Sequence, residues 1–147
     1  MDQWFMALKD FLRINPHLGL VYPLHPNHLA KPAADAHLSP LPQVHLMPAL
    51  NYGETCHLLS ECEMVVTDSG GIQEEAATLG VPTVICRKTT ERMEAVDYGI
   101  ARLAGTEPDT ILSAMAWAQT VGRTKGKAFQ NTVFGDGEAS ARIADLI

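Results

Sequence analysis

The feature that most constrains the fold of this chain is an alternation of short apolar segments with segments of helical pattern. The apolar segments are brief and continuously apolar, as strands are when helices cover both faces of their sheet. Strands separated by helices pair in parallel, and the helices then lie on both sides. The pattern therefore predicts an α/β fold with a doubly wound parallel sheet. The expected strands lie in residues 18–24, 44–47, 64–68, 82–86 and 101–105.

The expected helices are defined by apolar residues at helical spacing and by residues that end helices. The first contains Trp4, Phe5 and Leu8 in step, and an Asn-Pro pair follows it. Gly80 and Gly99 each follow a later helical pattern, as residues just beyond a helix often do. The expected helices lie in residues 2–14, 51–62, 70–80 and 90–99, from 106 onward, and in 134–147, with residues 25–42 partly helical.

Two of these helices carry more specific expectations. The sequence TEPD at residues 106–109 reads as a capping box with a proline in the first helical turn. In the last helix, Ala139, Ile143 and Leu146 are in step, which predicts that they share one face.

Length and charge limit what the chain is expected to bind. Its 147 residues fit one domain, and 11 basic against 17 acidic residues give a formal net charge of −6. No run of Lys or Arg is present, so neither nucleic acid nor an anionic membrane is an expected partner. Because the overall field opposes an anionic ligand, local groups would have to hold one.

The cysteines and the start of the chain suggest a compartment and a truncation. Cys56, Cys62 and Cys86 form no C-x-x-C pair, so we expect reduced, partly buried thiols in a cytoplasmic protein. No apolar run approaches the roughly 18 residues of a membrane-spanning helix. The chain begins at once with a helical pattern. We therefore expect it to be a fragment of a longer protein.

The strand-to-helix corner in VVTDSGGIQEEAATLGVP, residues 65–82, is the first candidate site. In doubly wound sheets, ligands bind beyond the carboxyl ends of the strands, where this corner is expected. A helix that begins at Gly70 would offer unpaired N–H groups to a phosphate, and Gly70 and Gly71 would let it approach closely. Ser69 would cap the helix or bind a phosphate oxygen, and Glu75 lies where it could accept from sugar hydroxyls. The alternative is a simple cap and tight turn, with Glu74 and Glu75 as favourable helix charges.

A second candidate segment, RKTTERMEA at residues 87–95, follows the next expected strand at the same edge of the sheet. It offers Arg87, Lys88 and Arg92 near the first corner. The helix dipole disfavours a cation in a first helical turn, so Arg92 there indicates an anion to be held. The alternative is a solvated cap in which Glu91 and Arg92 form a surface pair.

Residues 65–106, VVTDSGGIQEEAATLGVPTVICRKTTERMEAVDYGIARLAGT, resemble the C-terminal half of the non-hydrolysing UDP-N-acetylglucosamine 2-epimerases. The hallmark of that family is TDSGGIQEEA followed by RxTTERPEA. The flanking segments LVYPLHPN and FGDGEASARI also resemble family segments, so the resemblance covers nearly the whole chain. It implies a Rossmann-like domain corresponding to the C-terminal domain of the two-domain GT-B fold. Residues 1–147 would then be a single UDP-sugar-binding domain without the family's N-terminal domain.

The resemblance also implies roles for individual residues. Ser69, Gly70 and Gly71 would hold the diphosphate, Glu75 the ribose hydroxyls, and Arg92 the phosphates from the neighbouring loop. His25 matches a family histidine near the nucleotide and the activating second sugar nucleotide.

The implied reaction interconverts UDP-N-acetylglucosamine and UDP-N-acetylmannosamine, for cell-surface polysaccharide biosynthesis. UDP is eliminated to leave 2-acetamidoglucal and is then added back. UDP-N-acetylglucosamine would be both substrate and activator, with no cofactor.

Departures from the family pattern limit these implications. We expect the family's N-terminal domain, which supplies the acidic residues for proton transfer, to be lacking, and we therefore expect no catalytic residue in this chain and no turnover by it alone. Thr55 stands where the family often has an aromatic residue near the uracil, and Met93 stands where it has proline. Half of a GT-B glycosyltransferase and a non-catalytic sugar-nucleotide-binding module are the alternative functions.

Two further expectations concern metals and assembly. His25-x-x-His28 with His37 or His45 could hold a metal, but no Cys or acidic ligand lies at a standard spacing, so no metal is expected. The surfaces that would pack on the missing N-terminal domain predict a homo-oligomer.

Overall fold

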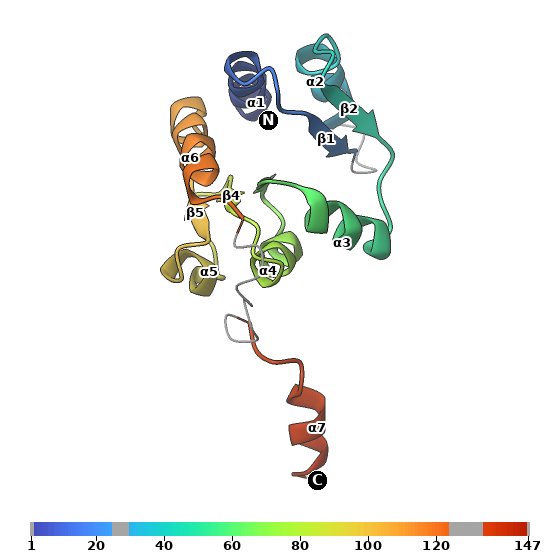
Figure 1. Ribbon diagram of the computed structural model, residues 1–147, viewed down its shortest axis with the longest axis vertical. Coiled ribbons are helices and arrows are strands. Elements are labelled where there is room, and N and C mark those ends of the chain that lie inside the picture. Colours follow the sequence, from blue (N-terminus) through green and yellow to red (C-terminus); the bar gives the residue numbers. More distant parts are fainter. Residues whose placement is uncertain (1, 25–29, 124–133, 147) are drawn as a thin grey trace.

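The computed structural model describes residues 2–24, 30–123 and 134–146, and its elements follow the predicted alternation (Figure 1). All five predicted strands and the main predicted helices are present, with bounds that differ by a few residues. In chain order the elements are α1 (Asp2–Ile14), β1 (Leu20–Pro23), α2 (Ala30–His37), β2 (Val44–Met47), α3 (Tyr52–Glu61), β3 (Val65–Thr67), α4 (Gly70–Thr78), β4 (Thr83–Ile85), α5 (Met93–Asp97), β5 (Ala101–Leu103), α6 (Pro108–Val121) and α7 (Ala139–Ala144).

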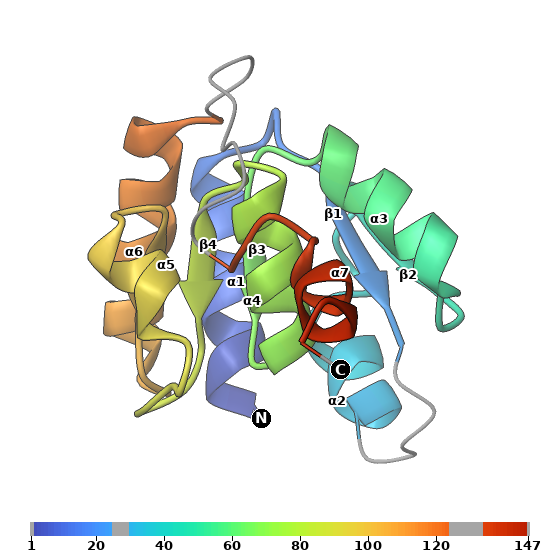
Figure 2. The same ribbon diagram turned by 90° about the horizontal axis from the view of Figure 1, so that it is seen from below.

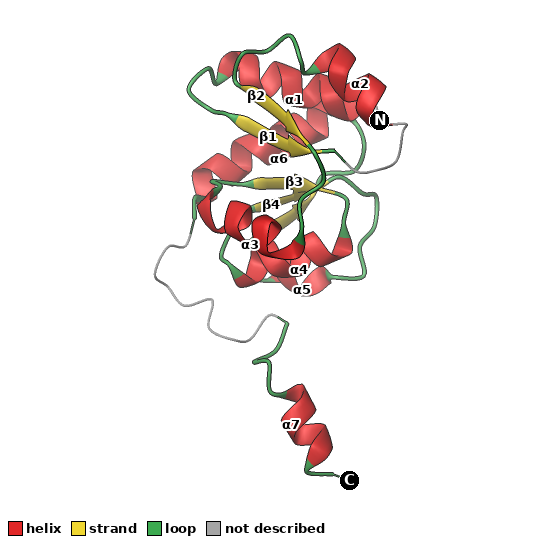
Figure 3. Ribbon diagram, turned by 90° about the vertical axis from the view of Figure 1, so that its right-hand side faces the viewer, coloured by secondary structure: helices red, strands yellow, loops and turns green. Residues whose placement is uncertain are grey.

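The strands pair in parallel, as predicted, but the described strands form two hydrogen-bonded sheets rather than one. β1 pairs with β2, and β3, β4 and β5 form a second sheet in that order. Leu20 of β1, Leu46 of β2 and Val66 of β3 nevertheless pack against one core cluster that contains Val84 of β4. The two sheets therefore share one core, and Figure 3 shows β2, β1, β3 and β4 following one another across the molecule.

Helices cover both faces of the strands. On one face, α1 packs against α2 and α6, and α6 contacts β4. On the other face, α4 contacts β3 and β4 and also packs against α3 and α5. Figure 2 shows α1 and α4 on opposite sides of the strands. This is the doubly wound arrangement that the strand and helix pattern predicts.

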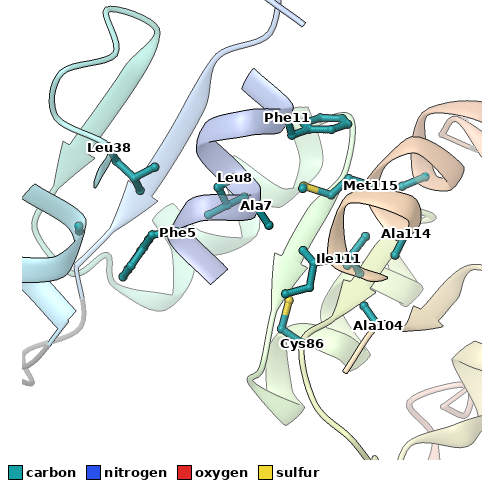
Figure 4. Close-up of a cluster of buried hydrophobic side chains, with 13 residues drawn as sticks. Phe5, Ala7, Leu8, Phe11, Leu38, Cys86, Ala104, Ile111, Ala114 and Met115 are labelled. Carbon is teal, nitrogen blue, oxygen red and sulfur yellow. The ribbon is translucent and has the colours of Figure 1, made fainter. Parts of the chain in front are cut away.

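The main core lies between α1 and α6 and explains the apolar pattern of the first helix. Phe5 is fully buried, and Phe11 and Met115 are almost fully buried. In Figure 4, Phe11 of α1 lies near Met115 of α6, whereas Phe5 extends from the other side of α1, the side on which Leu38 lies after α2. The apolar stripe of α1 is thus wide enough to pack on two neighbouring segments at once.

The start of α6 corrects one sequence prediction. The N-cap residue is Glu107, its side chain makes no capping hydrogen bond, and Pro108 is in the first turn. A capping box from Thr106 to Asp109 requires Thr106 at the N-cap. The N-cap is instead the next residue, Glu107, so the predicted capping box does not form. A complete capping box is found instead at α3, where Asn51 and Glu54 exchange hydrogen bonds of 2.8 and 3.0 Å.

The last helix is shorter than predicted. α7 covers Ala139–Ala144, and Figure 1 shows it away from the other elements. Ile143 is 58% exposed, and Leu146 lies beyond the helix and is 86% exposed. The face predicted for Ala139, Ile143 and Leu146 is therefore not packed against the rest of the described chain.

Candidate functional site

The corner between β3 and α4 has the geometry of an open helix N-terminus. Ser69 is the N-cap residue of α4, with φ −80° and ψ 130°, and its side chain makes no capping hydrogen bond. The Ser69 N–H donates to the hydroxyl of Thr67 at 3.0 Å, which holds the turn from within the strand. A Cβ built at Gly71 would meet nothing within 4 Å. Among the described residues nothing bonds to the Ser69 hydroxyl, and the first turn of α4 presents it beside an open glycine.

Arg92, in the loop after β4, reaches this corner. A Cβ built at Gly70 would lie 2.5 Å from Nη1 and 2.6 Å from Cζ of Arg92, so a side chain at position 70 would require the guanidinium to shift. Arg92 is the N-cap residue of α5, and its side chain is 25% exposed. The two candidate segments therefore meet, because β3 and β4 are parallel neighbours that end at the same edge.

The guanidinium of Arg92 is held by two carboxylates. Its Nε donates to Glu74 and its Nη1 donates to Glu91, so the Glu91–Arg92 pair weighed from the sequence is present. The hydrogen bond that Arg92 donates to Glu74 and the charges of both carboxylates raise the pKa of Arg92, against the opposing effect of desolvation. Arg87 also pairs with Glu91 at 3.4 Å, whereas Lys88 is exposed. A cation is thus fixed at the amino end of α4.

Glu74 and Glu75 are adjacent in sequence but differ in their contacts. The carboxylate of Glu74 is occupied by Arg92, whereas the carboxylate of Glu75 makes no hydrogen bond or ion pair with another described residue. The pKa of the exposed Tyr52 is raised by a hydrogen bond with Cys56 and also by the charge of Glu75. The charge of Glu75 thus acts on Tyr52 at the start of α3, whereas the carboxylate of Glu74 bonds to Arg92.

Asp68 is a site residue to which the sequence assigned no role. Burial raises the pKa of Tyr22, and the charge of Asp68 raises it further. Burial likewise raises the pKa of Cys86 to about 12, again with a contribution from Asp68. Asp68 is exposed, and its charge acts on Tyr22 of β1 and on Cys86 directly after β4. Cys86 itself is buried in the core, whereas Cys56 and Cys62 are partly buried.

A family model described as UDP-N-acetylglucosamine 2-epimerase matches residues 1–147, which is the whole sequence. The chain belongs to this family. A curated relative from Ralstonia solanacearum, named a probable UDP-N-acetylglucosamine 2-epimerase, is 38% identical over 142 residues. That match covers 96% of this chain and 38% of the relative, so the chain spans well under half of the relative's length. Enzymes of this name are isomerases.

Solved structures of the 2-epimerase family superimpose on the chain. The UDP-GlcNAc 2-epimerase of Neisseria meningitidis bound to UDP-GlcNAc matches with a TM-score of 0.86 and 29% identity, over 99% of this chain and 39% of that one. The S. aureus MnaA–UDP structure matches with a TM-score of 0.87 and 29% identity, over 97% of this chain and 40% of that one. These matches confirm the predicted Rossmann-like α/β fold of the GT-B type.

The structure brings together five of the six residues that the family resemblance assigned to ligand binding. Ser69, Gly70 and Gly71 form the corner, Arg92 lies against it, and Glu75 is on the same helix. The sixth, His25, lies outside the described residues, as does His28. Thr55 donates its hydroxyl to the Asn51 carbonyl at 2.9 Å within the first turn of α3. It is thus occupied within its own helix where the family often has an aromatic residue.

Sequence reasoning missed Gln73 and Thr90. Gln73 is fully buried on α4, and its Oε1 accepts a 2.8 Å hydrogen bond from the hydroxyl of Thr90 in the loop that carries Arg92. The available signal was a polar amide three and four positions before Ala76 and Ala77, on the same face of the expected helix.

Metal and membrane features can be judged for the described ranges only. Among the residues of 2–24, 30–123 and 134–146, no three His, Cys, Asp or Glu side chains are grouped as a metal site requires. None of the helices described there has both the length and the apolar character needed to span a bilayer.

Proposed function

We propose that the chain is the UDP-binding domain of a UDP-N-acetylglucosamine 2-epimerase. The observation that carries the proposal is the guanidinium of Arg92, held against Gly70 at the amino end of α4. A helix N-terminus and an arginine that converge on one point form a strong anion site, and a diphosphate matches both. The similarity to family structures bound to UDP and to UDP-GlcNAc supports the same ligand.

Each residue of the corner has a physical role in this proposal. The N–H groups of the first turn of α4 and the hydroxyl of Ser69 donate to the diphosphate oxygens, and Gly71 leaves the approach open. Arg92 supplies local positive charge. A chain with a formal net charge of −6 needs such a local group in order to hold an anion. Glu75, which is free of Arg92, accepts hydrogen bonds from the ribose hydroxyls.

In the family reaction, UDP leaves C1 of the sugar as the proton leaves C2, and 2-acetamidoglucal forms. UDP then adds back to C1, and C2 receives a proton on its opposite face. The contribution of this chain is to hold the leaving UDP and to balance the charge that develops on it. His25 is proposed to lie near the nucleotide and the activating sugar nucleotide. The acid and base groups at C2 would belong to an N-terminal domain, and a homo-oligomer is the proposed assembly.

The chain alone is expected to bind UDP without epimerising UDP-sugars, because general acid and base groups must lie within hydrogen-bonding reach of C2. Calorimetry with UDP, UMP and GDP measures the binding, and an assay of conversion between the two UDP-sugars measures the turnover. Turnover similar to that of a complete family enzyme would contradict the proposal. So would equal affinity for UDP and GDP, because UDP recognition requires a preference for the base.

Glu75→Ala is expected to weaken UDP binding by roughly tenfold, because a ribose diol loses its charged acceptor. The same change is expected to have much less effect on 2′-deoxy-UDP, which presents one hydroxyl fewer. Glu63→Ala is the matched control, since Glu63 is an exposed carboxylate on the approach to β3. An equal loss for the two nucleotides would rule out the ribose role of Glu75.

A further inference from the structure

Gln73 is an unusual residue to find where α4 packs on the sheet. Its side chain is fully buried, as are those of its helix neighbours Ala76 and Ala77. Its Oε1 accepts from Thr90, while its Nε2 has no partner among the described residues. An apolar side chain would fill this place without leaving an amide unsatisfied. The one hydrogen bond that Gln73 makes is therefore the feature to explain.

That hydrogen bond joins α4 to the loop that carries Arg92. The hydroxyl of Thr90 donates to Gln73 at 2.8 Å and accepts from the backbone N–H of Arg92 at 3.2 Å. A hydroxyl has one proton to donate and lone pairs to accept with, so Thr90 serves both partners at once. The path from the buried amide to the Arg92 backbone thus consists of two hydrogen bonds.

The guanidinium of Arg92 packs closely against Gly70, so its position is sensitive to small displacements. The nearest guanidinium atom lies 2.5 Å from the place that a Cβ at position 70 would take, and the guanidinium bonds to Glu74 on the same helix. A shift of the loop that carries Thr90 and Arg92 would move the guanidinium away from the amino end of α4. We propose that Gln73 and Thr90 are positioning residues that set Arg92 in place for the diphosphate, without touching the ligand themselves. This inference rests on the proposed function.

Thr90→Val removes the hydroxyl at nearly constant shape, and Thr90→Ser retains it. Thr89→Val is the matched control, because Thr89 is the exposed neighbour in the same loop. We expect Thr90→Val and Gln73→Met to weaken UDP binding by roughly tenfold, and Thr90→Ser and Thr89→Val to stay within about twofold. Affinity for uridine, followed by chemical-shift titration, is expected to stay unchanged, because uridine has no phosphate for Arg92 to hold.

A double-mutant cycle separates positioning from a general loss of structure. If Thr90 acts through Arg92, Thr90→Val should add less than about a twofold loss of UDP affinity in an Arg92→Ala chain. A full loss in that background, an equal loss for UDP and uridine, or no loss in the single variants would overturn the inference. Absence of UDP binding by the unsubstituted chain would instead contradict the proposed function, and the positioning role with it.

Discussion

Arg92→Ala is expected to weaken UDP binding by roughly 30- to 100-fold, the largest effect of any substitution at the corner. Two losses combine in this variant. The diphosphate loses the guanidinium that lies beside Gly70, and Glu74 loses the cation that neutralises it. The uncompensated carboxylate of Glu74 then repels the ligand from within α4. Isothermal calorimetry at low and moderate salt measures the loss, and the repulsive part should shrink as salt screens it.

The two parts can be separated with further variants. Combining Arg92→Ala with Glu74→Gln removes the repulsion by Glu74 but does not restore the contact between Arg92 and the diphosphate. The double variant should therefore recover only part of the UDP affinity. Arg92→Lys retains a charge but not the planar fork, and should fall between the alanine variant and the unsubstituted chain. Arg13→Ala is the control, because Arg13 is an exposed arginine on α1 paired loosely with Asp10 at 4.0 Å. Unchanged UDP affinity in Arg92→Ala would contradict the assignment of the corner.

The meeting of Arg92 with Gly70 could be predicted from the sequence because it follows from topology. Short apolar strands alternating with helices require parallel pairing, and parallel neighbours bring the loops after them to one edge. The residues that follow Thr67 and Ile85 must therefore lie close together, whatever their side chains are. Local patterns were enough for this part of the site.

The contacts within the site depend on helix rotation, which local patterns do not fix. Whether Glu74 or Glu75 meets Arg92 is decided by the roughly 100° that separates neighbouring residues on α4. The bond from Gln73 to Thr90 spans 17 positions and depends on the same rotation. The position of Glu107 rather than Thr106 at the N-cap of α6 is a shift of one residue, and cap motifs alone do not resolve such shifts.

Arg123 carries the second large prediction, which concerns stability. It follows the C-cap Gly122 of α6, and its guanidinium reaches the carboxyl ends of two other helices. Nη1 donates to the carbonyls of Leu59, Ser60 and Cys62 at the end of α3, and Nη2 donates to that of Leu79 beyond α4 at 3.5 Å. The last carbonyls of a helix lack partners within it and carry its negative dipole end. One cation thus serves two helix ends and ties them to α6.

Arg123→Ala is therefore expected to lower the free energy of unfolding by about 2–4 kcal/mol, from the lost charged hydrogen bonds and the unsatisfied carbonyls. Urea unfolding followed by circular dichroism measures the change. Arg123→Lys should lose less, because it keeps the charge but cannot span both helix ends. Arg13→Ala should stay within about 0.5 kcal/mol, as surface substitutions usually do. A loss below about 1 kcal/mol for Arg123→Ala would mean that water replaces the guanidinium at these carbonyls, and would contradict a stabilising role for Arg123 at the two helix ends.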